Sequence, residues 1–122
     1  MPKGGQAKNL GGWGETQACN FLTRSGFSIV ERNYFTTAGE IDIIARAPGG
    51  EYYFIEVKTR QQGDFATDTA ITPFKKMKIQ KTLRRYCYDR RISDQHGLIT
   101  AGLLVTINRF AGSIKFRLAV YC

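Results

Sequence analysis

Three side chains on two neighbouring segments, Asp42, Glu56 and Lys58, bring together two carboxylates and an amine. Carboxylate oxygens are ligands that Mg²⁺ prefers, and an ammonium group stabilises charge that develops on a phosphate. This combination is typical of metal-assisted phosphodiester hydrolysis, in which the ion polarises the phosphate and lowers the pKa of a bound water. Taken alone, Glu56-x-Lys58 has a plainer interpretation, because an ion pair on an exposed strand face has the same spacing.

The two acids lie on segments that the sequence predicts to be neighbouring strands. Residues 39–47 alternate with a period of two, so their side chains should point to two opposite faces of a sheet. Pro48-Gly49-Gly50 is a turn signal, and residues 52–59 read as the next strand of a hairpin. On the first strand one face is predicted to carry Ile41, Ile43 and Ala45, and the other Glu40, Asp42, Ile44 and Arg46.

The register of this hairpin decides whether the acids meet. If Ile44 lies opposite Phe54, then Asp42 lies opposite Glu56, and Lys58 shares their face. In the same register Arg46 faces Tyr52. Two facing carboxylates repel each other, and a divalent cation between them reverses that interaction. We therefore expect Mg²⁺ or Mn²⁺ at this position, with the Val57 carbonyl as a further ligand.

Glu15 is a third carboxylate, on a predicted helix that starts near Trp13 and ends before Gly26. It shares the apolar stripe of that helix with Ala18 and Leu22. An acid that points inward needs a partner, and a nearby metal ion would provide one. Placement in the first helical turn, where the macrodipole attracts carboxylates, explains the same residue equally well.

The remaining elements complete a mixed α/β domain. Thr72 followed by Pro73 is a good helix start, and its apolar stripe includes Leu83 and Tyr86. Residues 1–12 are predicted to form a flexible arm, and residues 13–122 a single domain with a mixed sheet flanked by two helices. In order, the expected elements are a helix at 13–25, strands at 27–35, 39–47 and 52–59, a helix at 73–91, and strands at 99–107 and 113–121.

The charge of the chain indicates a polyanionic partner. Lys and Arg number 18 against 10 Asp and Glu, which gives a formal net charge of +8. The segment 59–91 carries nine basic and three acidic residues, so it holds +6 of that excess. A solvated helix face normally mixes Glu with its Lys, and this one contains no Glu. The residues expected to contact phosphates are Arg60, Lys75, Lys76, Lys78, Lys81, Arg84 and Arg85.

Other classes of protein and site are disfavoured. No apolar stretch approaches the roughly 20 residues that cross a bilayer, and the N-terminus lacks the apolar segment of a secretion signal. Cys19, Cys87 and Cys122 are scattered, and His96 is the single histidine, so a disulfide framework or a Cys/His metal site is not expected. The cysteines should fill apolar space in a protein of the reducing cytoplasm, without a membrane or small-molecule partner.

Several ordered motifs resemble one bacterial family. Gly11-x-x-Gly14-Glu15-x-x-Ala18-x-x-x-Leu22-x-x-x-Gly26 and Arg32-Asn33 come first. Gly39-Glu40-Ile41-Asp42-Ile43-Ile44-Ala45 and Phe54-Ile55-Glu56-Val57-Lys58-Thr59-Arg60 follow. Together they cover about half of the chain and are similar to the YraN-type uncharacterised proteins, which resemble archaeal Holliday-junction resolvases and the wider PD-(D/E)xK nucleases.

This resemblance implies a restriction-endonuclease-like, resolvase-like core with the order α-β-β-β-α-β-β. It maps Glu15, Asp42, Glu56 and Lys58 onto the resolvase-type catalytic site. The metal ligands expected from the residues themselves are Asp42, Glu56, Val57 and Glu15. Family members often carry an Arg-Phe-Asp-Val-like segment near the penultimate strand, where this chain has Ala101-Gly102-Leu103-Leu104-Val105. That departure concerns the choice of substrate more than metal binding.

Two functions of different classes fit these observations. The first is a Mg²⁺-dependent endonuclease that hydrolyses phosphodiester bonds in DNA, branched DNA included. The second is a non-catalytic nucleic-acid-binding module that keeps a nuclease scaffold, because fold does not guarantee activity. A weaker third is a protein-interaction partner of a DNA-processing or ribosome-linked assembly. DNA is preferred to RNA as the partner, and symmetric action on two strands would favour a homodimer.

Overall fold

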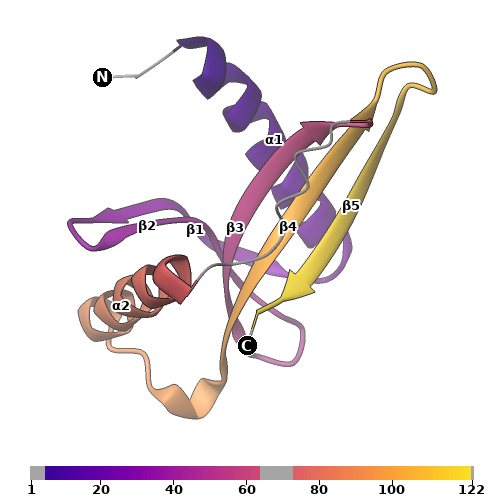
Figure 1. The fold of residues 1–122 in the computed structure, drawn as a ribbon. Helices are drawn as coiled ribbons and strands as arrows, with labels where there is room; N and C mark the ends of the chain where they lie inside the picture. The colour runs from indigo at the N-terminus through magenta and orange to yellow at the C-terminus, as the bar shows by residue number, and fades with distance from the viewer. Residues whose placement is uncertain (1–4, 64–72, 122) are drawn as a thin grey trace.

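The computed structural model describes residues 5–63 and 73–121, which form a five-stranded sheet with one helix on each face (Figure 1). A short 3₁₀ helix, η1 (Asp94–His96), precedes the fourth strand. The elements are α1 (Gly5–Arg24), β1 (Ser28–Thr36), β2 (Gly39–Arg46), β3 (Tyr52–Gln61), α2 (Pro73–Arg90), β4 (Leu98–Asn108) and β5 (Ser113–Val120).

The strands lie in the sheet in chain order, β1-β2-β3-β4-β5. The β1–β2, β2–β3 and β4–β5 pairs are antiparallel, and β3 and β4 are parallel because α2 connects them. The predicted mixed α/β fold, with two flanking helices and the order α-β-β-β-α-β-β, is confirmed. This architecture is consistent with a resolvase-like core.

Alternation along the central strands divides the core into two clusters, one under each helix. On β3, Ile55 packs beneath α1 while its neighbour Phe54 packs beneath α2. We call these clusters the α1-side core and the α2-side core. The buried residues of the α1-side core are Ala18, Cys19, Leu22, Ile43, Ala45, Ile55, Ala101, Leu103 and Val105, and those of the α2-side core are Tyr34, Ile41, Ile44, Phe54, Leu83 and Tyr86.

Helix α1 begins at Gly5, eight residues before the predicted start at Trp13. The expected flexible arm at residues 1–12 is therefore helical from Gly5 onward, and residues 1–4 lie outside the described part. Glycine lowers helix propensity by about 1 kcal/mol relative to alanine, yet extending a helix that is already nucleated requires no new nucleus. The Thr16 hydroxyl donates to the Gly12 carbonyl at 3.0 Å, as expected one turn apart.

Gly14 lets α1 approach the sheet closely. A Cβ atom built at this position would overlap the Thr59 hydroxyl of β3. At Gly12, one half-turn earlier, a Cβ atom would meet nothing within 4 Å. Gly14 therefore positions Glu15 by allowing the helix backbone to lie directly against the Thr59 side chain of β3.

The alternation of β2 breaks at Asp42, which corrects the predicted faces. Ile43 packs in the α1-side core as expected, but Ile41 packs in the α2-side core together with Ile44. On the neighbouring strand Asn33 has a left-handed φ of 55°, and it lies between Arg32, paired with Ile43, and Tyr34, paired with Ile41. One left-handed residue rotates the strand, and asparagine tolerates that conformation better than most residues.

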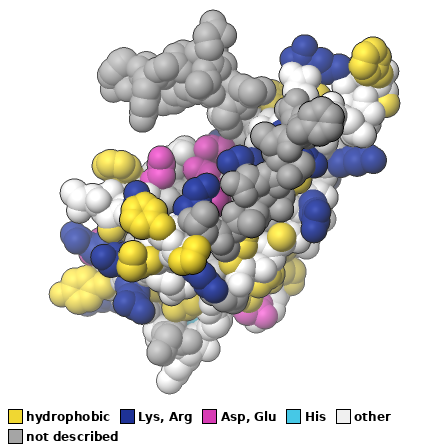
Figure 2. All heavy atoms as spheres, viewed as in Figure 1, with side chains coloured by type: hydrophobic (Ala, Val, Ile, Leu, Met, Phe, Trp, Pro, Cys, Tyr) yellow, Lys and Arg dark blue, Asp and Glu magenta, His cyan; other side chains and the backbone are white. Residues whose placement is uncertain are grey.

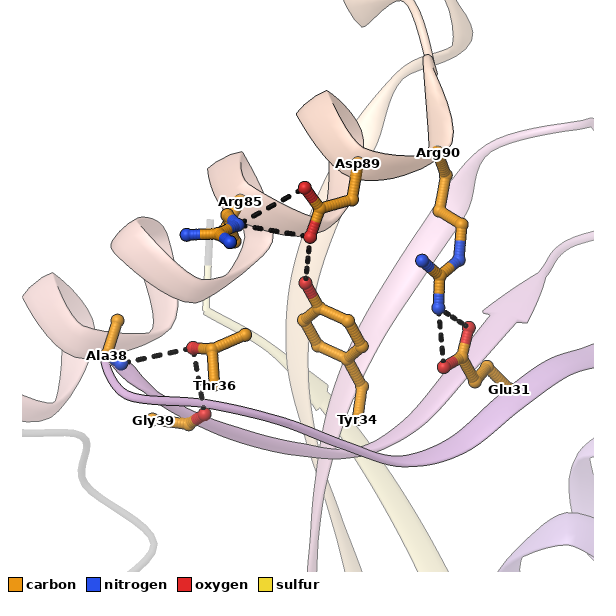
Figure 3. A network of polar contacts seen from close by, with 8 residues as sticks. All are labelled: Glu31, Tyr34, Thr36, Ala38, Gly39, Arg85, Asp89 and Arg90. Atoms are coloured by element: carbon orange, nitrogen blue, oxygen red, sulfur yellow. Dashed lines mark hydrogen bonds and ion pairs between the residues drawn. The ribbon is translucent and has the colours of Figure 1, made fainter.

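Polar contacts fasten α2 to the β1–β2 hairpin (Figure 3). Arg90 donates two hydrogen bonds to the Glu31 carboxylate, at 2.9 and 3.0 Å. Asp89 accepts from the Tyr34 hydroxyl at 3.2 Å and pairs with Arg85 at 3.1 Å. These contacts fix the basic helix relative to the strand that carries Asp42.

The two described cysteines occupy apolar surroundings, as the sequence predicts. Cys19 lies in the α1-side core, and Cys87 packs against the α2-side core; both are free thiols that fill apolar space. Cys122 lies outside the described residues. Within residues 5–63 and 73–121, neither helix is long and apolar enough to cross a membrane.

Candidate metal and nucleic-acid site

The β2–β3 ladder has the register that the sequence predicts. Ile44 lies opposite Phe54 and Arg46 opposite Tyr52, and the last backbone pair is Ile43–Ile55. The pairing of Asp42 with Glu56 would continue this register by one residue. At that point the Asp42 side chain bonds to β3 directly, because its Oδ2 accepts a hydrogen bond from the Val57 N–H at 2.8 Å.

Asp42 lies in an environment that disfavours its charged form. The pKa of Asp42 is raised from 3.8 to about 7, chiefly by burial, although the Val57 N–H acts in the opposite direction. Repulsion from the carboxylates of Glu15, Glu40 and Glu56 contributes to the same rise. Negative charge thus converges on this end of β2 from helix α1 and from strands β2 and β3.

Glu15 reaches this region from α1 and is paired with Arg32 of β1. Its carboxylate oxygen lies 3.6 Å from the Arg32 guanidinium, and its side chain is 17% exposed. Because α1 starts at Gly5, Glu15 lies well beyond the first turn, and the macrodipole interpretation of this residue is wrong. The inward-pointing interpretation holds, but the partner seen here is an arginine.

Tyr121 is a neighbour of Glu56 that the sequence does not indicate. The Tyr121 hydroxyl, just after β5, interacts with the Glu56 carboxylate, and burial together with this negative charge raises the pKa of Tyr121. The tyrosine ring fits because Gly102 lies opposite Glu56 on β4, and a Cβ atom at Gly102 would overlap the Tyr121 hydroxyl. The divergent segment 101–105 is therefore the buried centre of β4, and Gly102 makes room for the Tyr121 side chain beside Glu56.

Lys58 and Arg60 follow Glu56 on the same face of β3. Strand alternation places all three on the side of Phe54, the α2 side, beyond the part of the sheet that α2 covers. Lys58 is exposed and forms no ion pair with another described side chain. Arg60 is half-buried, and its Nε atom is buried without a hydrogen-bond partner among the described residues.

The basic residues of α2 lie in solvent, as the sequence predicts for phosphate contacts. Lys75, Lys76, Lys78, Lys81, Arg84 and Arg85 are all exposed. Arg85 also pairs with Asp89. Figure 2 shows a group of acidic side chains bordered by Lys and Arg side chains on the same face of the molecule.

The donor set suits a hard cation with few protein ligands. No group of three or more His, Cys, Asp or Glu side chains comes together to hold a metal ion within the described ranges. Mg²⁺ commonly uses one or two carboxylates and completes its shell with waters and substrate phosphates. Asp42 and Glu56 meet that smaller requirement, and the excess negative charge around Asp42 is what a bound cation would neutralise.

Comparison with known proteins gives a consistent family. Relatives named UPF0102 protein include one from Pelobacter propionicus, 45% identical over 76 residues (61% of this chain, 54% of the relative). One from Geotalea daltonii is 43% identical over 88 residues (71% and 68%), and one from Helicobacter pylori 50% over 72 (59% and 60%). The chain thus spans 54 to 68% of the length of these relatives.

The matched region contains the candidate site. The description "Uncharacterised protein family UPF0102" applies to residues 14–110, which include Glu15, Asp42, Glu56 and Lys58 together with the whole of α2. Tyr121 lies outside that range. On this match, and as its motifs predict, the chain belongs to the UPF0102 family, the YraN-type proteins.

Proposed function

We propose that this protein is a Mg²⁺-dependent endonuclease that hydrolyses phosphodiester bonds in DNA. The observation that carries the proposal is the position of Asp42, bonded to the Val57 N–H where the β2–β3 ladder ends and surrounded by further carboxylates. A fold without a ligand gains little from clustering acids around a buried one. The exposed basic face of α2 supplies the complementary attraction for a phosphate backbone.

Asp42 and Glu56 are the residues that would hold Mg²⁺ or Mn²⁺, with the Val57 carbonyl as a further oxygen ligand. When bound, such an ion polarises a phosphate and lowers the pKa of water. The Val57 N–H fixes one oxygen of Asp42 before any ligand arrives, which reduces the cost of ordering this carboxylate. In this proposal the Tyr121 hydroxyl, which interacts with Glu56, orients the second carboxylate in the same way.

Lys58 and Glu15 have supporting roles in this proposal. Lys58 is exposed on the face of Glu56, where its ammonium group would stabilise charge that develops on a phosphate. Glu15 is held by Arg32, so we assign it the task of adding negative potential at Asp42 rather than that of a direct ligand. Because Glu15 is mostly buried, its negative potential at Asp42 is stronger than that of a carboxylate at the surface.

The test is incubation of the purified protein with duplex, single-stranded and branched DNA in the presence of Mg²⁺ or Mn²⁺. Cutting is expected with metal and absent with EDTA. Asp42→Asn, Glu56→Gln and Lys58→Met should each abolish it without unfolding the protein. Glu51→Gln is the matched control, because Glu51 lies on the same hairpin at the opposite end of β3.

The control decides how the result is interpreted. Cutting that persists in Glu56→Gln comes from a contaminant and leaves the proposal without support. Loss of cutting in Glu51→Gln as well would show that the preparation, not the site, is affected.

A non-catalytic nucleic-acid-binding module is the second candidate. It is favoured by the fact that no three metal-binding side chains converge in the described part of the chain. This function predicts DNA binding that weakens steeply with salt and does not respond to Mg²⁺. Asp42→Asn would then leave the affinity unchanged or raise it by removing a negative charge, and no DNA would be cut.

The described cysteines indicate the cellular compartment that we propose for this activity. Free, apolar-packed cysteines suit the reducing cytoplasm, where DNA is also available. DNA rather than RNA, and a homodimer for symmetric action on two strands, stay predictions. Sedimentation analysis with and without DNA measures directly whether the protein forms a homodimer.

A further inference from the structure

The β4–β5 hairpin carries an aromatic side chain entirely in solvent at its tip. Phe110 is 105% exposed, as open to water as in an extended chain. The loop that holds it forms one far corner of the sheet in Figure 1, and Figure 2 shows hydrophobic and basic side chains at that corner. Single exposed apolar residues are common, so the setting of this one decides whether it matters.

The tip is braced rather than loose. Asn108 pairs with Ser113, and the Asn108 side-chain oxygen accepts a hydrogen bond from the Ala111 N–H at 3.1 Å. Gly112 adopts a left-handed φ of 65° that closes the turn. The Gln62 N–H of the neighbouring chain segment donates to the Ile107 carbonyl at 2.7 Å. Phe110 is therefore held in water by a fixed support.

The charged side chains on the strand face between Glu56 and the tip are all basic. Lys115 lies opposite Thr106, which in turn lies opposite Arg60, and Arg117 lies opposite Leu104, which lies opposite Lys58. Residues that pair directly share a face, so these four basic side chains line the same face as Glu56. From residue 97 to the C-terminus the sequence contains no Asp or Glu. The basic track consists of Lys58, Arg60, Lys115 and Arg117.

The length of this track matches several nucleotides. Glu56 lies opposite Gly102, and Asn108 at the hairpin end is six residues further along β4. At about 3.3 Å per strand residue the separation is roughly 20 Å. Stacked bases rise about 3.4 Å each, so the tip lies roughly six base steps from the Glu56 row.

We propose that nucleic acid lies along this basic track and that Phe110 stacks on an unpaired base at the edge of a duplex, about 20 Å from Glu56. Exposed aromatic rings bind unstacked bases of any sequence, and basic side chains beside them hold the phosphates. In this arrangement Arg109, Lys115 and Arg117 grip the backbone on either side of the ring. The proposal rests on the proposed function, because it requires a protein that binds nucleic acid.

A linear polyanion fits this surface better than a flat one. Two basic residues on β3 and two on β5 flank β4 between the carboxylate site and the tip, so together they can follow a phosphate backbone along its length. An anionic bilayer would also attract a basic tip with an aromatic ring. It would contact the tip alone, however, and leave the inner end of the track beside Glu56 unused.

The experiment uses the full chain in EDTA, so that no cutting occurs. The probe is a duplex with a single-stranded overhang that carries the fluorescent base 2-aminopurine at its first unpaired position. Wild-type protein is expected to change the fluorescence of that base on binding. Phe110→Ala should remove the change and weaken binding of the overhang DNA by about fivefold to a hundredfold. Binding of fully paired DNA should stay within about twofold.

Matched variants separate the ring from the fold. Phe110→Trp keeps a stacking surface and should retain the signal. Phe35→Ala removes another exposed phenylalanine, 75% exposed on β1 at the opposite edge of the sheet, and should change nothing. Lys115→Ala and Arg117→Ala should each weaken overhang and paired DNA alike and lower the salt dependence by about one counterion.

The outcomes distinguish this inference from the function on which it rests. If wild-type protein binds DNA and Phe110→Ala binds overhang DNA equally well, the role of the tip is wrong while nucleic-acid binding stands. If wild-type protein binds no DNA, both fail. If Phe110 instead determines binding to vesicles of anionic phospholipid, the tip belongs to a membrane contact and the proposal is overturned.

Discussion

The Asp42 carboxylate accepts the backbone N–H of Val57 at 2.8 Å, one residue beyond the last β2–β3 backbone pair. A side chain therefore takes over the hydrogen bonding where the two strands begin to separate. This satisfies an N–H that would otherwise lose its partner, and it places the carboxylate between the strands at the end of the ladder. The geometry of the candidate site is thus part of how the sheet ends.

The burial of Asp42 predicts how stability depends on pH. Its pKa in the folded chain is about 7, against an ordinary value of 3.8, so the folded state binds more protons between these values. Stability contributed by the neutral form is complete below about pH 4 and is lost as pH rises to about 7, by about 4 kcal/mol at most. Urea unfolding of metal-free protein at pH 5 and pH 8 measures this loss.

Substitutions at Asp42 test whether its carboxyl group causes this pH dependence of stability. Asp42→Asn keeps an oxygen for the Val57 N–H but carries no charge, so its stability should vary much less between pH 5 and pH 8. Asp42→Ala leaves the N–H without this acceptor and should be less stable than Asp42→Asn by about 1–3 kcal/mol. An unchanged pH profile in Asp42→Asn would assign the dependence to another group.

A second prediction concerns the contact between α1 and β3. Gly14→Ala forces a methyl group onto the Thr59 hydroxyl and should lower the free energy of unfolding by about 1–3 kcal/mol. Gly12→Ala on the same helix meets nothing and should raise it by about 0.5–1 kcal/mol. Both variants replace glycine by alanine in α1, so the helix propensity changes equally. The difference in their free energies of unfolding, measured by chemical denaturation, is therefore the cost of the overlap with Thr59.

The double variant gives the specific signature. Thr59→Gly removes the overlapping atoms, so Gly14→Ala should cost much less in that background. Coupling energies of about 0.5–3 kcal/mol are usual for residues in contact. Additive effects of the two substitutions would show that α1 does not pack against β3 at Gly14.

The regular elements were predictable because each depends on local pattern. Alternating residues, the Pro48-Gly49-Gly50 turn and Pro73 at a helix start are signals carried by neighbouring residues, and they gave the strands and α2 to within one or two positions. The early start of α1 was missed because glycine content argues against a helix locally, whereas a nucleated helix extends through it.

The parts of the site that sequence could not reveal depend on tertiary contacts. The change of face at Ile41 accompanies the left-handed Asn33 on a different strand, and a period-two pattern carries no sign of it. Tyr121 meets Glu56 across β4 only because Gly102 leaves room. Arg32 pairs with Glu15 across the helix–sheet interface.

A third prediction concerns the Tyr121 hydroxyl, which interacts with Glu56. Tyr121→Phe removes this hydroxyl and retains the ring over Gly102, so the fold should be intact. Loss of a group that orients a metal ligand commonly costs 10- to 100-fold in affinity, and a decrease of about 10-fold in Mn²⁺ affinity is expected. Calorimetric titration measures the Mn²⁺ affinity. Tyr53→Phe is the control, because Tyr53 lies on the α1 side of β3, the strand that carries Glu56.

An unchanged Mn²⁺ affinity in Tyr121→Phe would mean that the tyrosine does not orient a metal ligand. Gly102→Ala gives an independent view, because the added methyl group displaces the Tyr121 ring. It should lower Mn²⁺ affinity in the wild-type background and have little further effect once Tyr121 has been replaced by alanine.

The last prediction separates two kinds of arginine on α2. Arg90 is bonded twice to Glu31 and lies over the rings of Tyr34 and Tyr86, whereas Arg84 is exposed and forms no ion pair among the described residues. Arg90→Ala should therefore lower stability, since it releases the end of α2 from β1. Arg84→Ala should leave stability within about 0.5 kcal/mol and weaken DNA binding with a salt dependence lower by about one counterion.

Thermal unfolding and DNA titration at several salt concentrations, performed on both variants, test this separation. Arg90→Lys is informative, because lysine keeps the charge but lacks the planar guanidinium that reaches Glu31 while it lies over Tyr34 and Tyr86, so it should lose part of the same stability. If Arg84→Ala binds DNA as tightly as wild type at every salt concentration, the exposed face of α2 does not contact phosphates. The basic track on the sheet would then have to account for DNA binding by itself.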